Sequence, residues 1–130
     1  MARLILDTTV LVTAERDRSR LDGLLADEDD VAIAAITAAE LLVGVHLADD
    51  AHREDRAGFV DDVLATIPTL DYDLPVARAH AELLAHVRRT GRPRGAHDLV
   101  IAATASATRR IVLSADAGAF ADLPGVAHRE

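Results

Sequence analysis

The chain has 130 residues, of which 50% are hydrophobic, enough for one compact core but too few for two, so we expect a single domain over residues 1–130. It has no cysteine, and all 14 basic residues are arginine; this excludes disulfides and thiolate zinc sites, as well as the lysine chemistry of Schiff bases and P-loops. A formal net charge of −8 argues against broad, nonspecific affinity for RNA, because the polyanion would be repelled at long range.

The first residues begin like a secretion signal. However, Asp7 interrupts the apolar stretch, and no small-residue cleavage site follows it. No other apolar run reaches membrane-spanning length. We therefore expect a soluble protein of the cytoplasm that has no contact with a membrane.

Strands and helices are expected to alternate along the first half of the chain. Residues 3–7 form a buried strand, and the threonines that follow offer the start of a helix. A second short helix is expected around residues 21–25, followed by an acidic connection and a strand over 31–36. Thr37 is expected to begin the next helix, with capping-box spacing to Glu40.

The same alternation continues in the second half. A helix over 50–66 precedes a short strand over 69–72, after which Asp73 caps a long helix that Gly91 ends. The remaining expected elements are a helix over 98–108, a strand over 111–114 and a short helix over 116–120.

This order of elements is typical of an α/β fold with a parallel sheet covered by helices on both faces. In such sheets the functional crevice lies at the carboxyl ends of the strands. Asp7 and Asp116 each come at the end of a predicted strand, so both are expected at that edge.

Four carboxylates occur where strands end or helices begin: Asp7, Glu40, Asp98 and Asp116. Each of them taken singly has a simple explanation as a helix cap or a first-turn charge. Asp98, however, shares a helix face with Ile101 and Ala105, which predicts that its carboxylate points toward the interior. The four acids together therefore suggest an acidic pocket.

Such a pocket needs neutralising charge. Two carboxylates about 5 Å apart repel by about 3 kcal/mol at an effective dielectric of about 20. Protonation, arginine partners or a divalent cation would each offset this repulsion. Oxygen ligands suit Mg²⁺ or Mn²⁺, and an ion of this kind in an acidic pocket is typical of phosphodiester hydrolysis.

Four arginines near Asp98 are candidates for holding substrate phosphates. Arg88 and Arg89 are equally well explained as cations favoured at a helix C-terminus. Arg92 and Arg94, in the loop that follows, are the better candidates. Aromatic residues make up only 2% of the chain, so little base stacking is expected.

Each of the four acids lies in a characteristic segment. These segments are Leu-Asp-Thr-Thr-Val-Leu at 6–11, Ile-Thr-Ala-Ala-Glu-Leu-Leu-Val-Gly at 36–44, His-Asp-Leu-Val-Ile-Ala-Ala-Thr-Ala at 97–105, and Val-Leu-Ser-Ala-Asp at 112–116 with Phe120 and Leu-Pro-Gly-Val after it. In this order and spacing they resemble the PIN-domain ribonucleases, in particular the VapC-type toxins of bacterial toxin–antitoxin pairs. The resemblance covers nearly the whole chain.

The resemblance implies a PIN-like three-layer α/β domain with a central, mostly parallel five-stranded sheet flanked by helices. It also implies endonucleolytic cleavage of RNA that depends on Mg²⁺ or Mn²⁺. The acidic quartet that holds the metal and catalyses the reaction would be Asp7, Glu40, Asp98 and Asp116. The hydroxyl side chains that would support the quartet are Thr8, beside the first aspartate, and Ser114, before the last acid.

The resemblance further implies partners other than the RNA substrate. Proteins of this kind form homodimers and assemble with a small cognate VapB-type antitoxin, which also binds operator DNA. The expected assembly of the present chain is therefore a homodimer within a toxin–antitoxin hetero-oligomer.

Two other interpretations compete with this one. Phosphoaspartyl enzymes and response receivers also have an aspartate after the first strand, but they rely on a lysine, and this chain has none. Dehalogenase-like enzymes require a second aspartate at the position that Thr9 occupies here. The other alternative is a catalytically silent PIN-like binding module, which would keep the acids as caps or to dock a basic partner peptide. The sequence leaves this alternative open.

Overall fold

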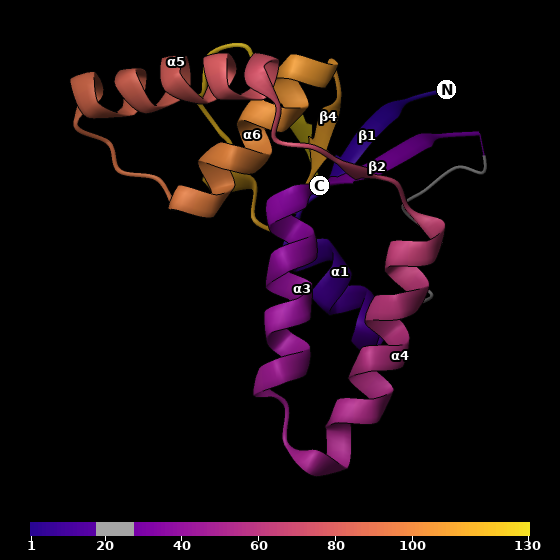
Figure 1. Cartoon of the computed structure of the whole chain (residues 1–130). Helices are drawn as coiled ribbons and strands as arrows, with labels where there is room; N and C mark the ends of the chain where they lie inside the picture. Colours follow the sequence, from indigo (N-terminus) through magenta and orange to yellow (C-terminus); the bar gives the residue numbers. More distant parts are fainter. Residues whose placement is uncertain (18–27) are drawn as a thin grey trace.

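The centre of the protein is a sheet of five short strands that all run in the same direction (Figure 1). The computed structural model describes residues 1–17 and 28–130, so the helix expected around 21–25 lies outside the described residues. The strands follow the order β3-β2-β1-β4-β5. Their bounds are Arg3–Leu6 for β1, Asp30–Ala34 for β2, Thr69–Leu70 for β3, Ile111–Leu113 for β4 and His128–Arg129 for β5. The predicted parallel sheet is confirmed.

Helices cover both faces of this sheet (Figure 1). Helices α3 and α4 form an antiparallel pair that projects away from the sheet, with α1 beside them, and α5 and α6 pack together on the other side. The bounds are Thr8–Arg16 for α1, Ala35–Leu47 for α3, Asp50–Thr66 for α4, Leu74–Thr90 for α5 and Ala96–Thr108 for α6, with a 3-10 turn, η1, at Ala117–Ala119. In the described part of the chain no helix is both long and apolar enough to cross a membrane.

Successive residues of the central strand belong to different hydrophobic cores. Ile5 packs in the core that α5 and α6 cover, whereas Leu6 packs in the core formed with α1, α3 and α4. Both side chains are completely buried. Because neighbouring residues of a strand point to opposite faces, a strand covered on both sides is apolar throughout, and the three-layer arrangement follows.

Several predicted boundaries agree with the structure because local signals fix them. Helix α4 spans the predicted residues 50–66. The side chain of Asp73 accepts a hydrogen bond from the Val76 N–H at the start of α5, and Gly91 ends that helix in the left-handed conformation, with φ of 65°. A residue without Cβ adopts this conformation at little cost.

The expected start of α3 is wrong. The helix begins at Ala35 and not at Thr37, and the preceding strand ends at Ala34. Thr37 is therefore a completely buried helix residue, and its hydroxyl has no hydrogen-bond partner among the described residues. The alanine-rich run before Thr37 suits a strand or a helix equally well, so packing against the sheet decides the boundary. Glu40 is not part of a capping box.

Other elements also differ from expectation, and the strands expected over 3–7, 69–72 and 111–114 end one or two residues earlier. Helix α6 begins at Ala96, which places Asp98 in its first turn and not at its cap. The helix expected after Asp116 is only the single turn η1. The last strand, β5, was absent from the predicted elements, because two exposed residues carry no periodic pattern; backbone hydrogen bonds to β4 create it.

Candidate functional site

Asp7 joins the ends of the two central strands. It follows β1 directly, and its N–H donates to the carbonyl of Leu113, the last residue of β4, at 2.9 Å. Asp7 also occupies the N-cap position of α1, but its side chain makes no capping hydrogen bond. This carboxylate is only 2% exposed. A buried acid that does not cap its helix is available for another role.

Two hydroxyl groups hold one oxygen of Asp7. Thr9 Oγ1 and Ser114 Oγ donate to Asp7 Oδ2 at 2.9 and 2.8 Å. The other oxygen, Oδ1, accepts no hydrogen bond from the described residues. The carboxylate is therefore fixed in orientation while one oxygen remains available for a ligand.

Thr8, expected beside the first aspartate, contacts a different acid. Its hydroxyl donates to Glu40 Oε1 at 3.0 Å, and the threonine that contacts Asp7 is Thr9. Successive helix residues point about 100° apart, so the two adjacent threonines serve two different acids. His97 Nδ1 lies 3.5 Å from the other oxygen of Glu40, with the imidazole 57% exposed at the rim. The pairing of each threonine with its acid could not be read from the sequence.

The pKa of Asp98 depends on the burial of this residue and on the charges of the other acids at the site. Burial raises the pKa of its carboxyl group above the ordinary aspartate value. The pKa is raised further by the negative charges of the other three acids, which are Asp7, Glu40 and Asp116; His97 opposes this rise. Acids that are distant in sequence thus act on one another.

Asp116 is linked to Asp7 through Ser114. The Asp116 N–H donates to Ser114 Oγ at 2.9 Å, while the same hydroxyl donates to Asp7. Asp116 itself is exposed. The order of the site from its buried end to its exposed end is therefore Asp7, Ser114, Asp116.

Three of the four acids, Asp7, Glu40 and Asp98, line a pocket of about 380 Å³ at the carboxyl edge of the sheet, and Asp116 is not among its lining residues. Its lining residues are Asp7, Thr8, Thr9, Val12, Thr13, Glu40 and Asp98. Among the described residues, no three histidine, aspartate or glutamate side chains are grouped tightly enough to enclose a metal ion. This spacing disfavours a cage made entirely of protein ligands. The side chains that line the pocket offer carboxylate and hydroxyl oxygens, which are ligands for hard divalent cations.

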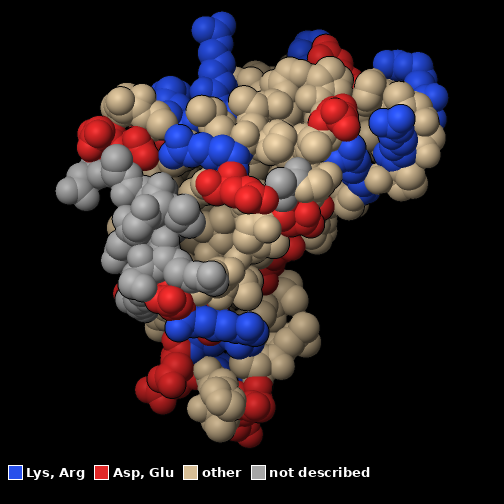
Figure 2. Space-filling model, turned by 180° about the vertical axis from the view of Figure 1, so that it is seen from behind, with Lys and Arg blue, Asp and Glu red and all other residues tan. Residues whose placement is uncertain are grey.

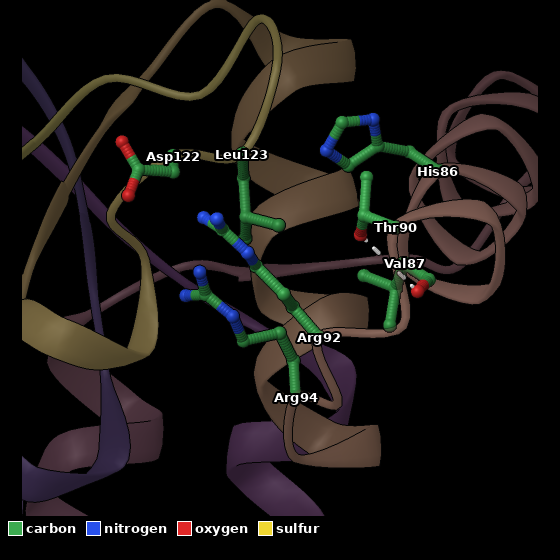
Figure 3. A pocket seen from close by; sticks show the side chains of 7 residues that line it. All are labelled: His86, Val87, Thr90, Arg92, Arg94, Asp122 and Leu123. Atoms are coloured by element: carbon green, nitrogen blue, oxygen red, sulfur yellow. Dashed lines mark hydrogen bonds between the residues drawn. The ribbon is translucent and has the colours of Figure 1, made fainter.

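Arg92 and Arg94 line a different, neighbouring pocket (Figure 3). This arginine pocket, as we call it, has a volume of about 560 Å³, and its lining residues are His86, Val87, Thr90, Arg92, Arg94, Asp122 and Leu123. Arg94 Nη1 donates to the Gly118 carbonyl at 2.9 Å. The expected phosphate-binding arginines therefore lie beside the acidic pocket and do not line it.

Fold and site together define a three-layer α/β protein with an acidic pocket at the carboxyl edge of a parallel sheet. The model of the PIN domain family matches residues 4–126, and the chain belongs to this family.

Relatives with similar sequences and structures are known. Ribonuclease VapC5 of Mycobacterium tuberculosis is 36% identical over 127 residues, which cover 97% of this chain and 91% of the relative. A crystal structure of VapBC-5 from the same organism, a member of the VapBC family of toxin–antitoxin systems, matches with a TM-score of 0.79 and 34% identity, over 99% of this chain and 97% of that one. VapBC2 from Rickettsia felis, bound to a promoter DNA fragment, matches with a TM-score of 0.88 over 98% and 97% of the two chains; at 24% identity it shows the fold alone.

Proposed function

We propose that this chain is a metal-dependent endoribonuclease that hydrolyses RNA phosphodiester bonds and acts as the toxin of a toxin–antitoxin pair. Membership of the PIN domain family and the similarity to a named ribonuclease support the reaction. The observation that carries the proposal is the pocket at the carboxyl edge of the sheet, which Asp7, Glu40 and Asp98 line together. The pKa of Asp98 is raised by burial and by the charges of Asp7, Glu40 and Asp116, which agrees with this arrangement. In this proposal residues 1–130 form one nuclease domain. The protein acts in the cytoplasm, where its RNA substrate would be found.

The metal would be Mg²⁺ or Mn²⁺. The ligand atoms available at the site are oxygens, and the accumulated negative charge favours a divalent cation. The residues that would hold it are Asp7, Glu40, Asp98 and Asp116, one or two of them by direct contact and the others through water molecules. When bound, an ion of this kind acts as a Lewis acid, lowering the pKa of water and offsetting charge on the phosphate.

The contribution of the protein is to fix the acids before the substrate arrives. Thr9 and Ser114 hold Asp7 through one oxygen, and Thr8 holds Glu40. Side chains that are already oriented lose little freedom when a ligand binds, which favours both binding and catalysis. Burial and the neighbouring negative charges disfavour the charged form of Asp98, so a cation that offsets this cost gains affinity there.

The direct test is cleavage of RNA by the purified chain without its antitoxin, in Mn²⁺ and in EDTA. We expect cleavage with metal, none with EDTA, and none for Asp98→Asn. Asp61→Asn, an identical change on the exposed face of α4, is the matched control and should cleave as well as the wild type. An inert wild type with metal present would instead favour the silent module that docks a basic peptide.

The proposed partners are a cognate VapB-type antitoxin and a second copy of the chain. Large apolar side chains are exposed on α1 and α3, namely Val12, Leu42, Val43 and Leu47, and Val12 also lines the acidic pocket. An apolar surface next to an acidic site suits a partner that covers the site. Co-expression with a cognate VapB-type antitoxin should give a stable complex of larger mass, with cleavage suppressed. A chain that stays monomeric and active would contradict this assignment.

A further inference from the structure

We propose that the arginine pocket binds one nucleotide unit of the RNA strand, next to the place where the strand is cut. This assignment rests on the proposed ribonuclease function. The arginine pocket would be a second point of contact with the RNA, outside the acidic pocket. It would bind the phosphate of the nucleotide and the hydrogen-bond donors of the base or ribose.

The two arginines of the pocket form no ion pair with a carboxylate of residues 1–17 or 28–130. Ion pairs occupy five other arginines in the described residues, namely Arg3, Arg53, Arg56, Arg110 and Arg129. Arg92 and Arg94 make none with the carboxylates that the structure describes, and in Figure 3 both side chains extend toward the same part of the pocket. The two arginines outnumber the one carboxylate that lines the same pocket, Asp122, so in a chain with a net charge of −8 this pocket is an attractive place for an anion.

The pocket lies directly beside the last acid of the candidate site. Arg94 donates to the carbonyl of Gly118, and a Cβ added to Gly118 would lie 3.6 Å from Asp116 Oδ1. In Figure 2 one group of basic side chains lies at the upper right of the face and others lie at its top, left and lower part, while acidic side chains run down its middle. An RNA strand that passes Asp116 therefore meets the arginines next.

The remaining wall residues indicate a nucleotide and not a free phosphate ion. Asp122 lies across the pocket from the guanidinium groups, and it would repel a small anion that filled the space between them (Figure 3). A nucleotide satisfies both charges, with its phosphate on the arginines and a base N–H or ribose 2′-OH donating to Asp122. The apolar side chains of Val87 and Leu123 offer a surface for the sugar or base.

Arg92 provides the cleaner test, because Arg94 also holds the Gly118 backbone. Binding of a fluorescent RNA oligonucleotide is measured for Asp98→Asn, which binds without cutting, at several salt concentrations. Adding Arg92→Gln should weaken binding about fivefold and reduce the slope of log K against log salt by about 0.7, the loss of one phosphate contact. Arg78→Gln, on the exposed surface of α5, makes the same charge change outside the pocket and should leave the slope unchanged.

Two further measurements separate a nucleotide from other ligands. Asp122→Asn, a change that the left-handed backbone at this residue tolerates, should weaken RNA binding if the carboxylate accepts a hydrogen bond. Tighter binding by this variant would overturn the nucleotide assignment. Inorganic phosphate in the millimolar range should not displace the RNA, and displacement would mean a small-anion site.

The outcomes also separate this proposal from the function on which it rests. Equal salt slopes for Arg92→Gln and Arg78→Gln, in a chain that cuts RNA, would overturn the pocket assignment alone. A wild-type chain that neither binds nor cuts RNA would overturn both.

Discussion

Gly95 and Asp98 are so close that a Cβ added to the glycine would stand 2.8 Å from Asp98 Oδ2. Gly95 is the N-cap residue of α6, and its φ of −57° and ψ of 136° are accessible to any residue. The position therefore needs glycine for space and not for backbone freedom. The missing side chain is the room in which the Asp98 carboxylate lies.

Gly95→Ala is expected to displace Asp98 and lower the rate of RNA cleavage by about 10- to 100-fold, because misplacing a catalytic group by about 1 Å has effects of this size. The unfolding free energy should change by less than about 1 kcal/mol, as the backbone is unstrained. The control is Gly58→Ala, where nothing lies within 4 Å of the added Cβ; it should cleave normally. A fully active Gly95→Ala would show that Asp98 is free to move.

Ser114→Ala should affect both stability and cleavage. Ser114 is 2% exposed, and its hydroxyl links Asp7 to the Asp116 backbone. Removing this hydroxyl leaves polar groups without a partner and should lower the free energy of unfolding by about 1–3 kcal/mol. Cleavage should fall about tenfold, because Asp7 loses one of its two hydroxyl contacts. Urea unfolding and cleavage assays measure the two effects, with Ser106→Ala as the control. Unchanged stability would mean that the hydrogen bonds at Ser114 contribute nothing.

Glu40→Gln distinguishes a functional acid from a structural one. The amide oxygen still accepts the hydrogen bond of Thr8, and the residue does not cap α3, so the unfolding free energy should change by less than about 0.5 kcal/mol. Cleavage should fall by about 100-fold through loss of the charge. Glu54→Gln, on the exposed face of α4, serves as the neutral comparison. A lower melting temperature with intact turnover would assign Glu40 a structural role.

The raised pKa of Asp98 predicts how stability depends on pH without metal. Folding raises this pKa above its ordinary value of 3.8, so the folded chain binds more protons than the unfolded chain in the window above that value. The Asp98 contribution to stability is therefore full below 3.8 and is lost as pH rises through the folded pKa. In EDTA at neutral pH, Asp98→Asn should melt a few degrees higher than the wild type, and the gap should close in acid.

Asp61→Asn controls for the general relief of negative charge and should change the melting temperature less. Adding Mn²⁺ should reverse the order of wild type and Asp98→Asn, because a ligand of the folded state stabilises by about 2.7 kcal/mol at 100 times its Kd. A wild type that gains nothing from Mn²⁺ would count against the metal site.

The sequence determined the parts of this protein that depend on local or repeating signals. Apolar strands that alternate with helices predicted the parallel sheet, and Asp73 and Gly91 marked the two ends of α5. Asp7 and Asp116, which follow strands, and Asp98, in the first turn of a helix, predicted an acidic site, because parallel strands bring their carboxyl ends to one edge. These features need no knowledge of which side chains meet.

Only the tertiary structure decided which groups touch. Thr9 and not Thr8 supports Asp7, Gly95 leaves room for Asp98, and Arg92 lies in a pocket of its own. Packing also set the start of α3 and recruited β5. The physical reason is that each of these contacts joins different elements or depends on how one side chain turns. The direction in which a side chain points depends on how the helices pack on the sheet. The periodicity of the sequence does not predict this packing in such detail.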